Sequence, residues 1–535
     1  MKPFPVDVFE VRKLGIEEWQ KEFFWPVNDS EFFSLMDRIS DAFRGQMDAV
    51  PSFLQDLLIA NSGLIHQYAS FLHARMVVER LRVAGYDILF SDRSVNYWEI
   101  MENRFKRGSS PARIHWSERL KGKGTQALKF VLRNDLGVKA LGRFLVEGHK
   151  TVSLGSFSSL KREYCNKRNL LVAHRSSLDY FDHSGDECFD KSETRSIEMF
   201  TRNMLDRLRE ISEAEGLEFN ELSTLFLEHL TRRQISLSLS LYKAVSNRQR
   251  HKADTLLLSE VAKTHNKTIC LAVRRKFGTR VVGFEHGNTF GTLVTKYFGI
   301  TELAHCDEYM VATSGSLPYF RTKQQASSFA FGRDTIMSSV DTNYYYTLWE
   351  RNRSSDLPRR IQRIMVVGFP MNQIRYAEIP GHLSLMHLDL ELRITRFLKQ
   401  IGVEVVYKAH PDRYEEVKGF FDNVVDEVSS EPFERVYKRC DGYLFAHTDS
   451  STFGIALCTN KPIIVMDIEG KKWNEAAYSL LAKRCLLVPA RVDERNRIVF
   501  SEQELEAYLR APIEKPDEDF VNQVMNPRAA KAGMV

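Results

Sequence analysis

The sequence predicts an α/β protein whose strands are parallel and covered by helices on both faces. Strand-like and helix-like segments alternate along the C-terminal half: 363–370 predict a strand, 382–402 an amphipathic helix, and 403–411 a second strand. The strand-like segments are apolar throughout, without polar alternation, as in strands buried on both faces. Strands that alternate with helices form parallel sheets. We therefore expect a Rossmann-like domain in this half of the chain.

The alternation continues toward the C-terminus and adds two strands to the same sheet. The predicted elements are a helix near 432–439, a strand at 442–446, a loop at 447–451, a helix at 453–460 and a strand at 462–467. Each strand-like run is short and apolar, and each is followed by polar or small residues. This pattern indicates further strand–helix units of the same parallel sheet.

The N-terminal half shows a second set of alternating segments. Residues 63–84 carry apolar side chains at helical spacing and precede a short apolar strand, 85–92, so together they form half of a strand–helix–strand unit. A long helical region, 192–247, is interrupted near Gly216. The elements expected after it are a strand at 255–258, a helix that ends at Gly278 and a strand at 280–284. We expect a second Rossmann-like domain with extra N-terminal helices.

A polar stretch separates the two halves. Residues 332–360 are rich in Ser, Asn, Arg and Tyr, and we expect them to contain the linker. The predicted division is an N-terminal domain, 1–335, a C-terminal domain, 358–500, and a helical tail, 501–535, that packs back on the N-terminal domain by analogy with this fold class.

Composition excludes several classes of protein. The chain has 535 residues, of which 43% are hydrophobic and 27% charged, so it can bury two or three cores and is not a disordered or fibrous protein. No segment reaches the roughly 18 consecutive apolar residues of a membrane-spanning helix, and no secretory signal opens the chain, so we expect it in the cytoplasm. The 7 cysteines are scattered and form no C-x-x-C pair, which favours reduced, buried thiols.

Charge is concentrated in one segment. The net charge of +5 is too small for a general attraction to nucleic acid, and no nucleic-acid-binding module is recognisable. Residues 104–133, however, carry many Lys and Arg side chains with aromatic residues between them. This pattern is typical of a surface that rests on phosphate-bearing material, here an anionic inner membrane face or a lipid-diphosphate acceptor. A solvated basic loop has the same composition, so both interpretations remain open.

Three polar motifs follow predicted strands, where open parallel sheets bind their ligands. The first is Glu285-His286-Gly287, continued by Asn288 and Thr289. An adjacent carboxylate and imidazole suit general-base catalysis because burial and mutual interaction bring either pKa toward neutrality. The glycine lets a substrate approach the backbone. The same triplet also fits a capped turn with no chemistry of its own.

The second and third motifs lie in the C-terminal half. His410-Pro411 ends a strand, and the proline fixes the exit of the chain so that His410 can donate a hydrogen bond to a phosphate oxygen. Ser450, Ser451 and Thr452 begin a predicted helix, where hydroxyls and unpaired N–H groups form an anion site. An ordinary helix cap uses the same residue types.

The order of the three motifs across two α/β halves resembles bacterial glycosyltransferases of the GT-B type, in which two Rossmann-like domains face each other across a cleft. It is most similar to the group that builds surface polysaccharides from cytidine-activated donors: capsule and lipopolysaccharide Kdo transferases, sialyl- and polysialyltransferases, and CDP-glycerol glycerophosphotransferases. The resemblance extends over about residues 255–490 and includes the sequence NKPII at 460–464.

The resemblance implies a metal-independent transfer with no cofactor besides the nucleotide sugar. Glu285 or His286 would deprotonate the acceptor hydroxyl, and His410 would stabilise the phosphate that leaves with the nucleotide. The same phosphate would be held by the side chains of the third motif, Ser450, Ser451 and Thr452. Pro411 would fix the loop at this site, Gly287, Asn288 and Thr289 would form the acceptor loop, and Lys461 would contact the nucleotide.

Some features depart from these families or stay open. Sialyltransferase-like relatives place two acids in the first motif, whereas this chain has Glu then His. The identities of the base and of the donor therefore stay open. Whether the transfer inverts or retains the configuration of the sugar also stays open. No D-x-D metal pair is evident: Asp389-Leu390-Glu391 lies in a predicted amphipathic helix and is assigned to its solvated face. The acidic loop 179–190 has no ordered ligand spacing, so no metal site is expected.

The sequence therefore predicts a cytoplasmic glycosyltransferase, peripheral to the inner face of the membrane. It would move a sugar from a CMP- or CDP-linked donor to a surface polysaccharide or a lipid-linked glycan. Two alternatives remain: the same fold with a UDP-activated donor, or with nucleotide-sugar epimerase activity, and a non-catalytic relative that binds glycan in an export complex.

Overall fold

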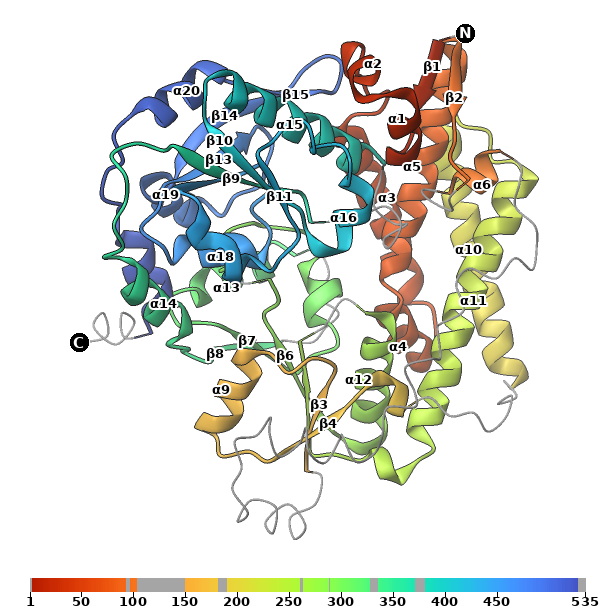
Figure 1. Cartoon of the computed structure of the whole chain (residues 1–535). Coiled ribbons are helices and arrows are strands. Elements are labelled where there is room, and N and C mark those ends of the chain that lie inside the picture. The colour runs from red at the N-terminus through yellow and green to blue at the C-terminus, as the bar shows by residue number, and fades with distance from the viewer. Residues whose placement is uncertain are drawn as a thin grey trace.

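The computed structural model describes residues 2–92, 97–102, 150–180, 190–259, 263–287, 289–327, 335–370 and 381–527. They form a mixed α/β structure with two large parallel sheets (Figure 1). The prediction of an α/β protein with parallel sheets is confirmed. Within the described ranges, no helix is both long and apolar enough to cross a membrane.

The C-terminal sheet has seven strands in the order β11-β10-β9-β12-β13-β14-β15. Its strands are β9 (Arg363–Val367), β10 (Glu404–Lys408), β11 (Glu427–Ser429), β12 (Gly442–Phe445), β13 (Ile463–Ile468), β14 (Leu486–Val492) and β15 (Ile498–Phe500). All neighbours are parallel except β14 and β15. The strand order reverses between β9 and β12, which is where such sheets bind ligands.

Both faces of this sheet are buried, as the apolar strand sequences predict. Ile364 and Val366 of β9 belong to one hydrophobic cluster, whereas Met365 and Val367 belong to another. The helices of this region are α15 (Gly381–Gln400), α16 (Tyr414–Val417), α17 (Phe433–Val436), α18 (Ser451–Leu457), α19 (Glu475–Arg484) and α20 (Glu502–Arg510). α15 packs against β10 and β15, and α19 and α20 pack against β14.

The N-terminal sheet has six parallel strands in the order β4-β3-β5-β6-β7-β8. Its strands are β3 (Thr151–Leu154), β4 (Val172–Arg175), β5 (Thr255–Leu258), β6 (Arg280–Phe284), β7 (Glu308–Val311) and β8 (Ile336–Ser339). The helices nearest to it in sequence are α9 (Ser159–Lys167), α12 (Thr264–Phe277), α13 (Leu317–Gln325) and α14 (Tyr344–Asn352). Phe284 of β6 and Phe445 of β12 belong to the same buried cluster, so the two sheets share part of their core.

Long helices stand beside the two sheets in Figure 1. They are α3 (Asp29–Met47), α4 (Ser52–Ala60), α5 (Gly63–Val83), α10 (Lys191–Ala214) and α11 (Glu221–Ser246), with the short α6 (Trp98–Met101). α3 packs against α5 and α10, and α12 of the N-terminal sheet packs against α4 and α11. The break predicted near Gly216 is the connection between α10 and α11, where Gly216 has a positive φ of 72°.

Two predicted segments differ from the structure. The strand of residues 85–92 is β2 (Tyr86–Leu89), but it pairs with β1 (Lys2–Pro5) in a separate two-stranded sheet. The expected linker contains β8 and α14, in which Tyr345 and Trp349 are buried. Polar composition hid these elements because β8 is an edge strand and α14 buries only part of its surface.

The two ends of the described chain each contact the other half of the molecule. Near the N-terminus, α1 (Val8–Leu14) and α2 (Ile16–Lys21) pack toward the C-terminal sheet, where Arg12 donates to the Glu416 carbonyl at 2.7 Å. Near the C-terminus, residues 521–525 lie against the N-terminal sheet, where Thr313 donates to the Val524 carbonyl. A Cβ on Gly315 would lie 2.0 Å from the Gln523 carbonyl oxygen, so this close approach requires glycine.

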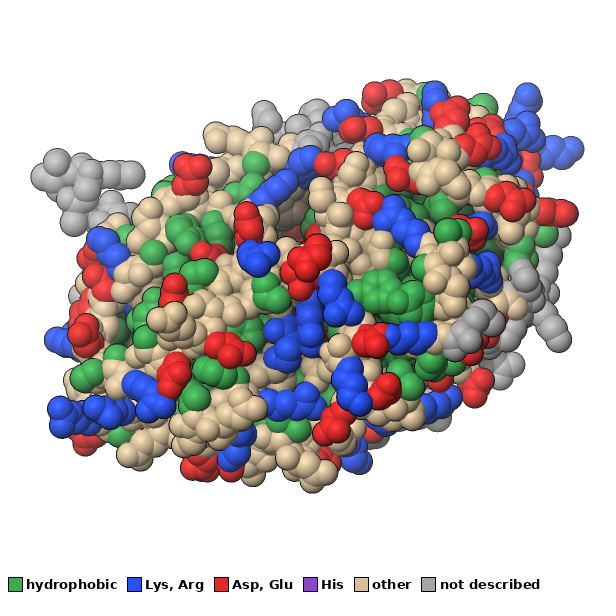
Figure 2. Space-filling view, turned by 90° about the horizontal axis from the view of Figure 1, so that it is seen from above, with side chains coloured by type: hydrophobic (Ala, Val, Ile, Leu, Met, Phe, Trp, Pro, Cys, Tyr) green, Lys and Arg blue, Asp and Glu red, His purple; other side chains and the backbone are tan. Residues whose placement is uncertain are grey.

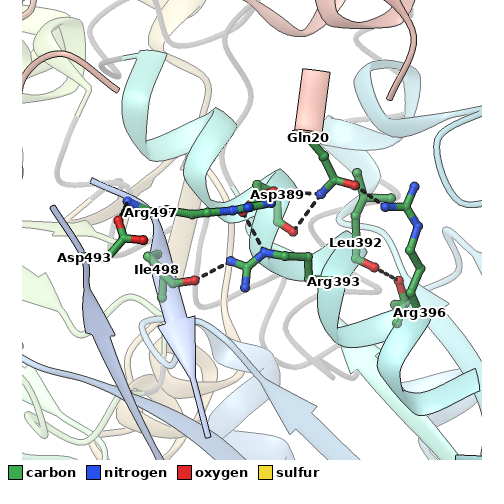
Figure 3. Close-up of polar contacts among 9 residues, drawn as sticks. Gln20, Asp389, Leu392, Arg393, Arg396, Asp493, Arg497 and Ile498 are labelled. Carbon is green, nitrogen blue, oxygen red and sulfur yellow. Dashed lines mark hydrogen bonds and ion pairs between the residues drawn. The ribbon is translucent and has the colours of Figure 1, made fainter. Parts of the chain in front are cut away.

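A buried polar network fastens the N-terminal helices to the C-terminal sheet (Figure 3). Asp389 of α15 is completely buried and accepts hydrogen bonds from Gln20 of α2 at 2.7 Å and from Arg393 and Arg497. The predicted solvated face for Asp389 and Glu391 is therefore wrong, because both carboxylates are fully buried and paired with arginines. Figure 2 shows the face seen from above, where acidic and basic side chains are interspersed.

Candidate functional site

The first motif follows β6 at the carboxyl end of the N-terminal sheet. Glu285 is 5% exposed, and its carboxylate accepts hydrogen bonds from the backbone N–H groups of Phe290 at 3.2 Å and Ala312 at 2.9 Å. These bonds fasten the motif loop to the end of β7. Burial raises the pKa of Glu285 to about 7, although the two backbone hydrogen bonds act in the opposite direction. Glu285 thus positions the loop and titrates near neutrality.

The remaining residues of the first motif differ in exposure. His286 is exposed, and Gly287 has a φ of 93°, which favours glycine. Thr289 is buried and its carbonyl accepts from the Thr292 N–H at 3.1 Å, whereas Asn288 lies outside the described residues.

A carboxylate that the sequence reasoning missed lies near His286. Burial raises the pKa of Glu302, in the short helical turn Gly299–Leu303, whereas the charges of Lys323 and His286 act in the opposite direction. Tyr309 donates to this carboxylate at 3.2 Å. An acid in a helical turn carries no distinctive sequence signal, so only the tertiary structure reveals it.

The second motif ends β10 as predicted. His410 is half-buried, and its Nδ1 accepts from the Asp412 N–H at 3.3 Å, so the ring caps the short turn Pro411–Arg413. Beneath this turn, Arg413 and Glu391 form a fully buried ion pair with Nη1 to Oε2 at 3.0 Å.

The carboxylate of Glu391 also holds the neighbouring strand end. It accepts from the Phe369 N–H at 2.6 Å and from the Tyr407 hydroxyl at 2.8 Å. One buried carboxylate therefore connects the loop after β9, the end of β10 and the His410-Pro411 turn through Arg413. Sequence reasoning missed the pairing of Glu391 with Arg413 because the two residues are 22 positions apart and meet only through the fold.

The third motif joins β12 to α18. Ser450 is the cap of this helix, and its hydroxyl accepts from the Phe453 N–H at 3.3 Å. Ser451 is exposed and Thr452 is half-buried in the first turn. The capping role of Ser450 confirms that this sequence starts a helix, and the hydroxyls of Ser451 and Thr452 stand at the same strand end.

An aromatic cluster occupies the point where the strand order reverses. Phe369, after β9, stacks on His387 of α15 with ring centroids 4.3 Å apart and meets His447, after β12, edge to face at 5.2 Å. His447 Nε2 is buried without a hydrogen-bond partner, and burial lowers the pKa of His447. His447 thus brings a neutral, half-buried imidazole, with Nε2 buried, to the reversal point of the sheet.

The loop that carries the first motif meets the loop after β13, which in turn contacts the loop of the third motif. The Val294 N–H donates to the Lys472 carbonyl at 2.9 Å, and the Asn474 N–H donates to the Thr292 carbonyl at 2.8 Å. Residues 292–294 continue the loop of the first motif, and residues 472–474 follow β13. Lys471 Nζ then donates to the Thr448 hydroxyl at 2.6 Å, in the loop of the third motif. Strand ends of both sheets are therefore linked by hydrogen bonds.

Lys461 lies at the wrong end of the sheet for the role predicted from sequence. It precedes β13, whereas the three motifs follow their strands. Its Nζ donates to the carbonyls of Tyr437, at 3.0 Å, of Lys438, at 3.2 Å, and of Cys440. Lys461 is buried and closes the helical turns before β12, so it is not available to a ligand at the opposite strand ends. Lys471, which follows β13, lies at the same end of the sheet as the second and third motifs.

The structure tests the predictions on metal sites and on cysteines only where the residues concerned are described. Among the described residues, no group of three or more His, Cys, Asp or Glu side chains is arranged to hold a metal ion. The six described cysteines are free and buried, as predicted. The basic segment 104–133 and most of the acidic loop 179–190 lie outside the described residues, so both predictions remain predictions.

A pocket of about 770 Å³ lies away from the motifs, between the α1–α2 turn and α15. Of the three cations in its lining, Lys21 is paired with Glu18 at 2.9 Å and Lys399 with Asp426 at 2.6 Å, whereas Arg396 donates to the Gln20 amide oxygen. None of the three sequence motifs lines this pocket, so the candidate site remains at the strand ends.

Fold and site together define a mixed α/β protein whose polar residues gather at the carboxyl ends of two parallel sheets. Comparison with models of known protein families gave no match, and comparison with curated proteins gave none either.

Proposed function

We propose that this protein is a glycosyltransferase of the GT-B type, with two Rossmann-like units that face each other at the strand ends. It would transfer a sugar from a CMP- or CDP-activated donor to a surface polysaccharide or lipid-linked glycan. One observation carries the proposal: the loop after β6 is hydrogen-bonded to the loop after β13, and Lys471 continues this link to Thr448. A donor bound at one sheet would thus lie beside an acceptor bound at the other.

The nucleotide would bind where the strand order of the C-terminal sheet reverses. The residues available there are His410 after β10, Phe369 after β9, and Ser450, Ser451 and Thr452 after β12. Phe369 and the two histidines beside it supply aromatic surface, and the hydroxyls supply donors for phosphate. Buried Glu391 holds the segments after β9 and β10 in place before the ligand arrives.

Transfer would require charge on the leaving phosphate to be stabilised. His410 after β10 and Lys471 after β13 are basic side chains at these strand ends that would meet it. Burial lowers the pKa of Lys471 to about 8, so its ammonium form still predominates at pH 7. In a partly buried site a charge-assisted hydrogen bond from this group is stronger than in water.

His286 would deprotonate the acceptor hydroxyl, because it is exposed at the carboxyl end of β6. Glu285 would position the loop, since both of its carboxylate oxygens already accept backbone hydrogen bonds. Of the two bases that the sequence left open, Glu285 and His286, the proposal therefore takes His286. Association with an anionic membrane surface through 104–133 remains part of the proposal.

Nucleotide titration tests the proposal. The melting temperature of the full chain is measured with CMP, CDP, UMP, UDP and GDP at equal concentrations. Preferential stabilisation by a cytidine nucleotide supports the cytidine-linked donor, because a ligand stabilises only the state that it binds. Stabilisation by UDP alone would instead indicate that the enzyme uses a UDP-activated donor.

A variant pair identifies where the nucleotide binds. His410→Ala is expected to lower nucleotide stabilisation, and Lys461→Ala is expected to lower the melting temperature of the free protein without changing the shift. No stabilisation by any of the five nucleotides would overturn the proposal, and so would an unchanged shift in His410→Ala.

A further inference from the structure

A second pocket lies at the end of β13, next to the link between the two sheets. It has a volume of about 540 Å³, and its lining includes Val294, Lys471, Lys472, Trp473, Glu475 and Tyr478. Val294 comes from the loop after β6, whereas the other residues follow β13 or begin α19. The pocket therefore borders both sheets and lies apart from the nucleotide residues predicted from sequence.

The two aromatic rings of this pocket are held by one carboxylate. Asp467 of β13 accepts from Trp473 Nε1 at 3.0 Å through Oδ1 and from the Tyr478 hydroxyl at 2.6 Å through Oδ2. The ring centroids are 5.6 Å apart, and the ring planes meet at 47°. Because their polar atoms are already bound, the rings present carbon surface in fixed positions, and little conformational freedom is lost when a ligand binds.

Polar groups surround this aromatic surface. Lys472, Glu475 and Ser479 line the pocket and are exposed, so they can exchange water for ligand hydroxyls. Lys471 Nζ lies 4.3 Å from the centroid of the Trp473 ring and donates to Thr448 at the adjacent strand end. An aromatic surface with hydrogen-bonding groups at its edge matches a pyranose ring, which has a carbon-bound hydrogen face and a rim of hydroxyls.

The position of this pocket in the sheet favours a saccharide over a nucleobase as its ligand. The strand order reverses between β9 and β12, so the nucleotide is expected at the ends of β9, β10 and β12. The pocket lies one strand farther along, at the end of β13, and one wall belongs to the loop of the N-terminal sheet. A group bound there would contact Val294 of the loop after β6 and Lys471, which is bonded to Thr448 of the third-motif loop.

We propose that the pocket formed by Trp473, Tyr478, Glu475 and Lys472 binds a pyranose ring of the glycan acceptor. The role as acceptor rests on the proposed function, whereas saccharide binding by the pocket does not. The pocket is open, which allows a longer saccharide to continue beyond the bound ring.

Saturation-transfer difference NMR tests this inference with the full chain. The probes are the methyl pyranosides of glucose, galactose and N-acetylglucosamine, and CMP is measured in a separate sample. Transfer to ring protons of at least one pyranoside is expected. Trp473→Ala is expected to reduce this signal about tenfold, because the main contact surface is lost. Trp473→Phe keeps a ring and is expected to retain most of it.

Two further variants keep the test decisive if Trp473→Ala fails to fold. Glu475→Ala removes an exposed acceptor at the rim and is expected to reduce the pyranoside signal about threefold. Phe33→Ala removes an aromatic ring that is 49% exposed on α3 and does not line the pocket, so its signal should equal that of the wild type.

The outcomes separate this inference from the proposed function. Nucleotide binding without pyranoside binding overturns the inference and leaves the proposed function in place. Pyranoside binding that depends on Trp473, without binding of any nucleotide, supports the inference and overturns the proposed function. Equal pyranoside signals in wild type, Trp473→Ala and Glu475→Ala overturn the inference. Loss of CMP binding alone in Trp473→Ala also overturns it, by assigning the pocket to the nucleobase.

Discussion

Arg497 binds Asp389 through two hydrogen bonds, from Nε to Oδ2 at 2.8 Å and from Nη2 to Oδ1 at 2.7 Å. Asp389 is completely buried and is also bound by Gln20, so this pair joins the start of β15 to α15 and α2. Asp389→Asn is expected to lower the free energy of unfolding by about 3 kcal/mol, because it leaves the arginine charges without their partner. Urea denaturation measures the change.

The control for this variant is an exposed ion pair of similar length. Glu404 is paired with Arg363 at 3.2 Å and is 48% exposed. Glu404→Gln is expected to cost less than about 1 kcal/mol, since solvent screens exposed pairs. Equal losses in the two variants would contradict a stabilising role for the buried network.

Glu285 makes stability depend on pH. Its pKa is raised from 4.5 to about 7 in the folded protein, so folding favours the protonated form. This contribution is fully present below pH 4.5 and is lost as the pH rises through about 7. The free energy of unfolding should fall by about 3 kcal/mol over this window, and Glu285→Gln should remove the change. Urea denaturation of both proteins at several pH values checks it, and identical pH slopes would contradict it.

Lys471 should recognise phosphate. Lys471→Met is expected to weaken binding of the best-stabilising nucleotide about tenfold, because a charge-assisted hydrogen bond is lost, but to leave binding of the corresponding nucleoside unchanged. Nucleotide binding by the wild type should also weaken above about pH 8, where the Lys471 ammonium loses its proton. Isothermal titration calorimetry measures both affinities.

The control is Lys438→Met, which removes an exposed lysine at the other end of the sheet and should change neither affinity. If Lys471→Met weakened nucleoside and nucleotide binding equally, a specific phosphate contact would be refuted.

Lys461 should affect stability without affecting nucleotide affinity. Lys461→Met leaves three carbonyl acceptors without their common donor, so we expect a loss of about 2 kcal/mol in the free energy of unfolding. The dissociation constant for nucleotide, measured by calorimetry, should stay within about twofold of the wild type. A larger loss of affinity would contradict this prediction and would indicate that Lys461 contributes to nucleotide binding.

The strands were predictable because their sequences are apolar on both faces. The strands expected at 280–284 and 363–370 correspond to β6 and β9, and the helix expected at 382–402 corresponds to α15. The hydrophobic pattern also predicted that the three motifs follow strands. The structure agrees, because Glu285, His410 and Ser450 come after the carboxyl ends of β6, β10 and β12.

Partners that are distant in sequence were not predictable. Periodicity suggested a solvated side for α15, but Asp389 and Glu391 are buried because Arg497 and Arg413 reach them from other elements. The same limit applies to Lys461 and Lys471. Both are lysines near β13. Lys461 precedes the strand and has a structural role, whereas Lys471 follows the strand and is a candidate ligand contact.

The exchange of contacts between the chain ends has a consequence for biosynthesis. Gln20 lies 369 positions before its partner Asp389 in the sequence, and Trp25, whose carbonyl accepts from Asn496, lies 471 positions before that partner. A nascent chain leaves the ribosome from its N-terminus, so these early helices emerge long before the surfaces that cover them. During translation their apolar side chains would need a chaperone or a temporary partner, and release of the finished polypeptide would let both halves close together.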